Sequence, residues 1–316
     1  MLMLGTFLST LVGRYPKPGI HFAMLAGNDE LAHVLFWNLR VPRVCTAVLL
    51  GAVLGASGMV FQMIFANPLV EPGFLGVSQG AAFGAGLSIV LLGNRVWATQ
   101  GSAAAFATTG LCFSYMLARR IRFGGWILRL ILAGISVSAM FTAGLGFLKY
   151  TADPLDQLPE ITYWLLGGLW SVSWVRLLVI IPVVLPGLGL MAGFRWRLNL
   201  LSLNEETAYS MGAAPSRERT LLLGAAVVST AAVISVSGIV AWVGLIVPHI
   251  SRKIFGADTR FSLPGSMLIG AVFTLLCDDA ARAVLAGEIP LGILSSLFGA
   301  ASFLLLMISK TKELRR

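Results

Sequence analysis

Charged residues are scarce in this sequence. Of its 316 residues, 12% are charged and 57% are hydrophobic, whereas soluble globular domains carry about 25% charged residues. Many apolar runs approach the length of about 20 residues that a helix needs to cross a bilayer. No alternation typical of barrel strands is visible, so each run can satisfy its backbone hydrogen bonds only as a helix. The composition therefore excludes a soluble domain and predicts an all-α polytopic membrane protein.

Several chemical motifs are missing as well. No Gly-Lys-Ser or Gly-Lys-Thr occurs, so the chain has no Walker-type phosphate-binding loop, and there is no HExxH or CxxC. Cys45, Cys112 and Cys277 lie in apolar runs without metal-ligand spacing, and we expect them to be buried small hydrophobes. We therefore expect a chain that is not itself an enzyme and holds no cofactor or metal. If ATP drives it, another chain must bind the ATP and its Mg²⁺.

Ten apolar segments are candidates for membrane spans. The first, 1–12, is too short to cross a bilayer and lacks the basic residues of a signal peptide. The other nine are 44–65, 73–92, 97–118, 130–149, 175–194, 218–236, 238–251, 264–284 and 291–309. We interpret residues 1–316 as a single transmembrane domain.

The lysines and arginines indicate the orientation of these spans. With a cytoplasmic N-terminus, most of the 23 basic residues fall in cytoplasmic connections. The exceptions are Arg14, Lys17, Arg40, Arg43, Arg95, Lys149, Arg176 and Arg282. The sequence therefore predicts a multi-pass protein of the cell (inner) membrane with both termini in the cytoplasm. Because the net charge of +9 is distributed between spans, it does not indicate nucleic-acid binding.

One connection, 199–220, is polar and carries charges of both signs. Ser202 followed by Glu205 forms a capping-box pattern, Gly212 is a plausible helix stop, and Pro215 suits the first turn of the next helix. The pattern predicts a short cytoplasmic helix between the sixth and seventh spans. An ordinary solvated loop is the alternative.

Asp278 and Asp279 are acids within an apolar run. Intramembrane acids are candidates for proton or cation sites, which would suit a proton-coupled secondary transporter. Arg282 lies four residues after Asp278, so the two side chains share a helix face and a local ion pair is the other interpretation.

Two further segments have a structural and a functional interpretation. Arg40 and Arg43, held three apart by a proline, predict a stiff outward-facing cationic patch that either anchors the chain at the interface or docks carboxylates of an external partner. The segment 67–76, NPLVEPGFLG, breaks a hydrophobic region on the inner side. It is either a tight turn or a turn that lines a translocation path, because non-helical backbone at that depth must be covered by protein or line a cavity.

Five stretches together resemble one family. These are LRVPRVCTAVLLGAVLGASGMVFQMIFANPLVEPGFLGVSQGAAFGA (39–85), WLLGGLWSVSW (164–174), LNEETAYSMG (203–212), GLIVPHISR (244–252) and EIPLGILSSLFGAASFLLLM (288–307). They resemble, in order, the FecCD-type permease subunit of iron–siderophore, haem and vitamin B12 ABC importers. The resemblance implies a type II ABC importer permease with about ten spans. It also implies a second, usually identical, permease chain, two ATPase subunits and an external substrate-binding protein as partners.

The resemblance also implies roles for individual residues. Arg40, Arg43 and Arg282 match arginines that dock the binding protein. The turn Asn67-Pro68-Leu69 matches an inner constriction, and a second constriction is expected around Ile127 and Leu128. The residues implied to contact the ATPase are Glu205, Glu206, Ala208, Tyr209, Met211 and Gly212.

Two points stay open at the level of sequence. Relatives have a full first helix preceded by a basic segment, so here the helix is either truncated or poorly anchored. The ligand could be a ferric siderophore, haem, a corrinoid or an oxyanion. The alternative to an importer subunit is a proton-coupled transporter that uses Asp278 or Asp279.

Overall fold

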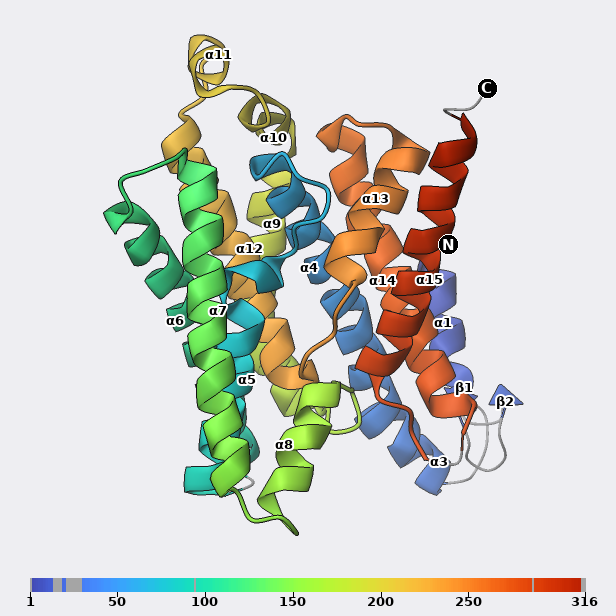
Figure 1. Ribbon diagram of the computed structural model, residues 1–316. Helices are drawn as coiled ribbons and strands as arrows, with labels where there is room; N and C mark the ends of the chain where they lie inside the picture. The colour runs from blue at the N-terminus through green and yellow to red at the C-terminus, as the bar shows by residue number, and fades with distance from the viewer. Residues whose placement is uncertain (1, 14–18, 21–29, 94, 286, 314–316) are drawn as a thin grey trace.

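The computed structural model describes residues 2–13, 19–20, 30–93, 95–285 and 287–313. Its long helices form one bundle whose axes run in roughly the same direction (Figure 1). They are α4 (Val41–Ile64), α5 (Val77–Leu92), α6 (Val96–Arg120), α7 (Trp126–Thr151), α9 (Trp174–Gly193), α12 (Pro215–Ser237), α13 (Val243–Phe255), α14 (Thr259–Ala283) and α15 (Leu291–Glu313).

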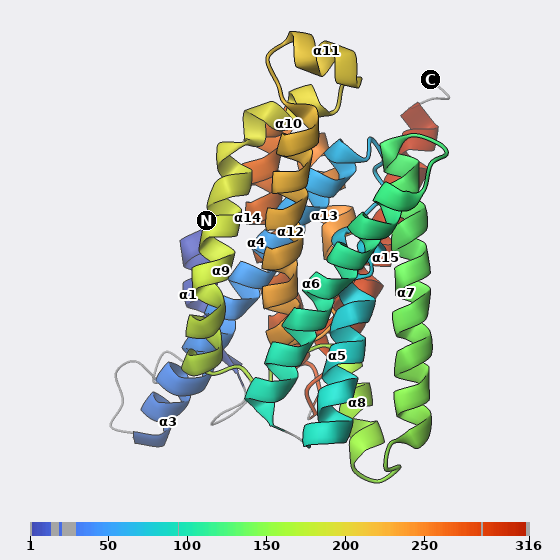
Figure 2. The same cartoon turned by 90° about the vertical axis from the view of Figure 1, so that its left-hand side faces the viewer.

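Short elements lie at the two ends of the bundle. One end carries α10 (Arg195–Leu201) and α11 (Glu205–Ser210), and we call it the α11 end (Figures 1 and 2). The opposite end, the α8 end, carries α3 (Glu30–Leu35), α8 (Gln157–Leu166) and the two-residue strands β1 (Val12–Gly13) and β2 (Gly19–Ile20). A π-helical turn, Phe36–Arg40, joins α3 to α4, and α1 (Leu2–Leu11) packs beside α14.

Each of the ten predicted apolar segments corresponds to a helix. Within the described part of the chain, five helices are long and apolar enough to cross a membrane: Glu30–Ile64, Trp126–Thr151, Trp174–Gly193, Pro215–Ser237 and Thr259–Ala283. The predicted span 238–251 was wrong at its start, because α13 begins only at Val243. The predicted span 73–92 begins too early, because a 3-10 turn, Pro72–Leu75, precedes α5, which begins at Val77. The protein is therefore an all-α polytopic membrane protein with two broken spans.

Small residues bring α4 and α14 close together. A Cβ atom added to Gly51 would lie 2.0 Å from the carbonyl oxygen of Gly270, so neither position has room for a side chain. One turn further along, Gly55 faces the backbone of Ser266 in the same way. Thr274 Oγ1 donates to the carbonyl of Ala47 at 2.7 Å across the same interface. Such close backbone approach is how helices pack in lipid, where apolar side chains gain little by leaving the bilayer.

Both broken spans contain extended or turned backbone inside the bundle. Between α4 and α5, the buried Gly76 has φ 79°, and between α12 and α13, Trp242 has φ 72°. The second break is held by backbone hydrogen bonds, since Gly168 N–H donates to Ser237 O at 2.7 Å. Protein covers these peptide groups, as membrane depth requires.

The cysteines differ in part from the prediction. Cys277 is buried, but Cys45 and Cys112 are exposed on the outside of the bundle. The physical reason is that a lipid-facing position accepts a small apolar side chain as readily as a core position does.

Candidate functional site

The connection 199–220 folds into a capped helix, as predicted, but with a different cap. Asn204 is the N-cap of α11, and its side chain accepts from Thr207 N–H at 3.1 Å. Ser202 Oγ instead donates to the carbonyl of Asn199, so the predicted Ser202–Glu205 capping box is wrong. Asn caps at least as well as Ser and stands directly before the helix. Gly212, with φ 82°, ends the helix as expected.

The side chains of α11 are mostly presented to solvent. Ala208 alone among the six predicted contact residues is buried, where it packs with Leu200 and Ala213. The other five are exposed: Glu205, Glu206, Tyr209, Met211 and Gly212. Beside the helix lies a concavity of about 710 Å³ that Glu205, Tyr209 and Arg217 help to line. The structure shows a protruding, solvent-exposed helix here, and its contact with an ATPase stays a prediction.

Helix α10 ties this protruding unit to two spans. Arg197 pairs with Glu218 on α12, and Arg219 donates to Leu201 O at 2.9 Å. Asn199 donates to Asp258 Oδ1 at 2.7 Å and accepts from Thr259 N–H at 3.0 Å, at the start of α14. The connection is therefore held in place rather than being a loose solvated loop.

The acid at this junction is the N-cap of α14. Backbone N–H of Arg260, and then the amide of Asn199, hold the pKa of Asp258 below its ordinary value. Arg260 also stacks on the ring of Trp196, with its guanidinium carbon 3.7 Å from the ring centroid. A charged N-cap and a cation–π contact thus join α10 to α14.

The three predicted docking arginines come together at the α8 end, but they are not an outward-facing patch. Arg40 and Arg43 are each 9% exposed and Arg282 is 7% exposed. Arg43 pairs with Asp278 at 2.9 Å and with Glu288 at 2.8 Å. The expectation of exposure is corrected because acids from α14 and from the segment before α15 reach α4, which spacing along α4 cannot reveal.

The same cluster anchors the first helix. Arg40 donates to the carbonyls of Thr10 and Leu11 at 3.4 and 3.3 Å, and Arg282 donates to the carbonyls of Ser9 and Val12 at 3.3 and 3.0 Å. The last carbonyls of a helix lack intrahelical donors and attract cations. Two guanidinium groups therefore fix the end of α1, which corrects the expectation that this helix is poorly anchored.

Asp278 and Asp279 both form ion pairs with arginine. Asp278 is fully buried and pairs with Arg282 at 3.0 Å as well as with Arg43. Asp279 pairs with Arg282 and accepts a hydrogen bond from Ser9 Oγ at 2.5 Å. The predicted local ion pair is present, and this charge-compensated geometry favours it over a proton relay.

The predicted constrictions lie at the α11 end. Asn67 Oδ1 accepts from Leu69 N–H at 2.9 Å and so stiffens the turn after α4, where Pro68 and Leu69 are exposed. Ile127 and Leu128 stand in the first turn of α7, and Leu128 is exposed. Whether these residues gate a path stays a prediction.

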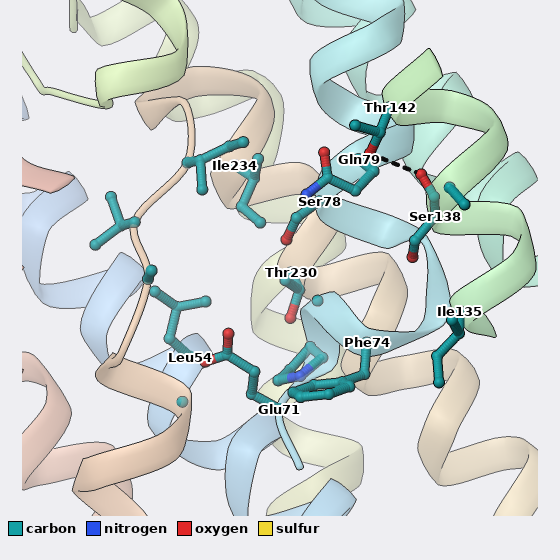
Figure 3. Close-up of a pocket in the computed structure, with 17 residues that line it drawn as sticks. Leu54, Glu71, Phe74, Ser78, Gln79, Ile135, Ser138, Thr142, Thr230 and Ile234 are labelled. Atoms are coloured by element: carbon teal, nitrogen blue, oxygen red, sulfur yellow. Dashed lines mark hydrogen bonds between the residues drawn. The ribbon is translucent and has the colours of Figure 1, made fainter. Parts of the chain in front are cut away.

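A cavity of about 400 Å³ lies where the two broken spans meet (Figure 3). Pro72 and Phe74 line it from the first break, and Ile239, Val240 and Ala241 from the second. Small hydroxyl and amide side chains complete the wall: Ser78, Gln79, Ser138, Thr142 and Thr230. Among the residues that the structure describes, no lysine or arginine lines the cavity, so a ligand could slide past its wall without forming an ion pair with a fixed cation.

Glu71 carries the acidic group of this cavity. Its carboxylate interacts with the backbone N–H of Trp242, so the side chain of one break is tied to the backbone of the other. Sequence reasoning identified the first break but missed the cavity. One signal was present, because Ser138 and Thr142 lie one turn apart and mark a polar face on an otherwise apolar helix.

Several known proteins are similar to this chain. A model of the FecCD transport family matches residues 1–309. The chain belongs to this family. It is 37% identical to the molybdate import system permease protein MolB of Haemophilus influenzae, over 96% of this chain and 91% of that one. It is 38% identical to the hemin transport system permease protein HmuU of Yersinia pestis, over 90% and 86% of the two chains.

Further similarities agree. The cobalamin import system permease protein BtuC of Halobacterium salinarum is 35% identical, over 96% of this chain and 82% of that one. A solved metal-chelate-type ABC transporter in an inward-facing conformation superimposes with a TM-score of 0.89 at 34% identity, covering 98% of this chain and 96% of that one. This FecCD chain is thus a multi-pass ABC importer permease, and the predicted family and fold are confirmed.

Proposed function

We propose that this FecCD chain is the membrane-spanning subunit of an importer that carries a bulky ligand of the iron–siderophore, haem or corrinoid class. A separate ATPase subunit drives it, and an external binding protein delivers the ligand. The observation that carries the proposal is α11, a capped and exposed helix tied through α10 to α12 and α14 on a chain without a phosphate-binding loop. Such a unit can transmit movement of a partner to the spans as a rigid body.

The orientation and the assembly belong to the same proposal. The α11 end and the end of α15 face the cytoplasm, α1 begins on the cytoplasmic side of its last turn, and the arginine cluster that holds this turn lies outside (Figure 1). Two identical permease chains stand side by side, so that the cavity beside the partly exposed helix α7 becomes half of a shared path. ATP and Mg²⁺ are bound by two ATPase subunits. The named relatives are permease proteins of molybdate import, hemin transport and cobalamin import systems, and the 400 Å³ cavity with hydroxyl walls suits a large ligand that is not held by a cation.

Reconstituted transport tests the proposal. The permease, its ATPase and its binding protein are placed in liposomes, and uptake of a labelled ferric siderophore, haem or corrinoid is measured. Uptake should require both ATP and the binding protein. Accumulation without ATP that follows an imposed pH gradient would refute it and support a proton-coupled transporter.

The family resemblance also assigns docking of the binding protein to Arg40, Arg43 and Arg282. Because these guanidinium groups are already paired, carboxylates of the binding protein would have to compete for them. Glu288 is the most exposed acid of the cluster, with 43% of its side chain accessible. Docking would therefore proceed by replacing Glu288 at Arg43.

A further inference from the structure

A second cavity, of about 350 Å³, lies at the α8 end on another face of the bundle. It is enclosed by the beginnings of α6 and α9, by α8 and by the last turn of α12, and Figure 2 shows α12 between α9 and α6 on this face. It shares no lining residue with the central cavity. It is therefore a separate site with a different environment.

This second cavity is lined by one cation and one acid that do not pair. Arg176, on α9, donates to Ser171 Oγ, and Glu160, on α8, faces the same space. Among the ion pairs of the described residues, neither Arg176 nor Glu160 takes part in one. Burial, and then the nearby Asp156, raise the pKa of Glu160, as expected where no cation touches the carboxylate. The space between the two groups suits a ligand with both an anionic and a cationic end.

Exposed apolar side chains form a discontinuous strip beyond this cavity. On α12, residues 229–237 are buried, and Val228 and Leu221 lie two and four helical turns before the cavity residue Ser235 on the same face. They are 40% and 46% exposed, although most of α12 is buried. On α9, Val179 lies one turn beyond Arg176 and is 61% exposed. Helices α6 and α9 each pack against α12 and flank this strip.

We propose that this cavity binds the headgroup of a zwitterionic phospholipid that carries an amine, with an acyl chain lying along α12 between α6 and α9. Arg176 contacts the phosphate, because guanidinium binds phosphate oxygens in a bidentate manner. Glu160 accepts from the amine. Tyr163 and Trp170, exposed aromatic residues 6.4 Å apart at the rim, are the residue types that sit at the level of lipid headgroups.

A soluble zwitterion would use the two charges but not the strip. On α9 the exposed Val179 follows the cavity residue Arg176 by one turn, and this neighbouring apolar surface favours an amphiphile as the occupant. The site does not depend on the transport function proposed above, because it involves neither the central cavity nor the residues of α11.

The test titrates the full-length purified chain in detergent with phosphatidylethanolamine and with phosphatidylglycerol of the same acyl chains, and counts bound lipid by native mass spectrometry. The wild-type chain should prefer phosphatidylethanolamine. Arg176→Gln should weaken binding of both lipids about tenfold, as expected for loss of a charged hydrogen bond. Glu160→Gln should weaken phosphatidylethanolamine alone and remove the preference.

Arg95→Gln is the matched control, since Arg95 is exposed just before α6 and does not line the cavity. It removes the same charge at the same end and should leave both affinities unchanged. If Arg176→Gln and Glu160→Gln behave like this control, the proposal is overturned.

A separate variant tests the apolar strip, and it keeps the proposal testable if a cavity variant does not fold. Val228→Trp places an indole ring on the exposed strip of α12, where it should displace the acyl chain. The lost apolar contact should weaken binding of the diacyl lipid about tenfold. Competition by soluble glycerophosphoethanolamine should be weak in every variant. If this soluble headgroup binds as tightly as the lipid, or if Val228→Trp has no effect, the site is not a lipid site.

Discussion

At the scale of single residues, the largest electrostatic feature is the cluster that Asp278 holds together. This carboxylate is fully buried and contacts Arg43 and Arg282, which come from α4 and α14. Each guanidinium in turn has a second partner, Glu288 for Arg43 and Asp279 for Arg282. A buried charge is tolerable only when it is paired and hydrogen-bonded. The cluster is therefore a structural tie between α1, α4 and α14, whatever else it does.

Removing the central charge should destabilise the fold. Asp278→Asn leaves Arg43 and Arg282 without a buried counter-charge, and such broken pairs cost about 3–5 kcal/mol. Thermal unfolding in detergent should show a large drop in Tm, whereas Asp156→Asn at an exposed position of the same end should show little. A variant that keeps the wild-type Tm but loses uptake would instead support the proton relay.

If the binding protein docks at this cluster, removing its exposed acid and reversing its arginine should change the affinity in opposite directions. Glu288→Gln frees Arg43 from its exposed partner and should strengthen binding of the external protein several-fold, about 1 kcal/mol. Arg43→Glu should weaken binding and reduce its salt dependence. Surface plasmon resonance on the nanodisc-embedded permease measures both. Equal affinities for wild type and both variants would rule out this docking mode.

At the scale of elements, α11 and α10 act as one unit. The cap at Asn204 orders α11, and Asn199 attaches α10 to the start of α14. At its other end α14 carries Asp278 and Arg282, so one helix of 25 residues joins the α11 end to the arginine cluster. Its close packing on α4 through Gly51 and Gly270 makes the pair rigid.

The two candidate caps of α11 can be separated. Asn204→Ala removes the acceptor for Thr207 N–H and should cost about 1 kcal/mol of local stability. Ser202→Ala should leave α11 unchanged, because its hydroxyl bonds only to Asn199 O among the described contacts. Hydrogen exchange of the α11 amides distinguishes the two. Faster exchange in Ser202→Ala alone would restore the capping box.

The junction between α10 and α14 should depend on pH. The pKa of Asp258 is lowered in the fold, so its ionised form stabilises the junction above the ordinary value of about 4. That contribution is lost as pH falls through the lowered pKa. The protection factors of the Thr259 and Arg260 amides, which correct for the slower intrinsic exchange at acidic pH, should then fall, and Asp258→Asn should remove this pH dependence. A pH-independent ratio between wild type and variant would contradict the assignment.

At the scale of the whole molecule, the cavity joins the two broken spans. Glu71 connects one break to the backbone of Trp242 in the other, and the polar face of α7 completes the wall. Broken spans around a polar cavity are typical of sites where a ligand passes a membrane protein.

Blocking this cavity should stop transport without preventing assembly. Ser138→Phe places a ring in the cavity, whereas Ser136→Phe changes an exposed position of α7 that does not line it. Uptake should fall at least about tenfold in the first variant and little in the second, since overfilling a confined space is costly and adding a ring at an exposed position is not. Co-purification of the ATPase confirms assembly. Normal uptake by Ser138→Phe would place the path elsewhere.

The sequence by itself determined the membrane class, the approximate spans, the family and the short helix in 199–220. These follow from local properties: apolar run length, the distribution of Lys and Arg, and motif order. The ion pair between Asp278 and Arg282 also follows, because it lies within one helix turn. The late start of α13 could not be predicted, because an apolar run has the same composition whether it is helical or extended.

Only the tertiary structure decided what distant segments do together. It buried Arg43 by bringing Asp278 and Glu288 to it, it fixed the end of α1 on the guanidinium groups of Arg40 and Arg282, and it joined two breaks about 170 residues apart around one cavity. Charge compensation and cavity shape depend on positions in space between helices. No spacing along the chain encodes them, so the same arginine can be read as an exposed docking group or found as a buried tie.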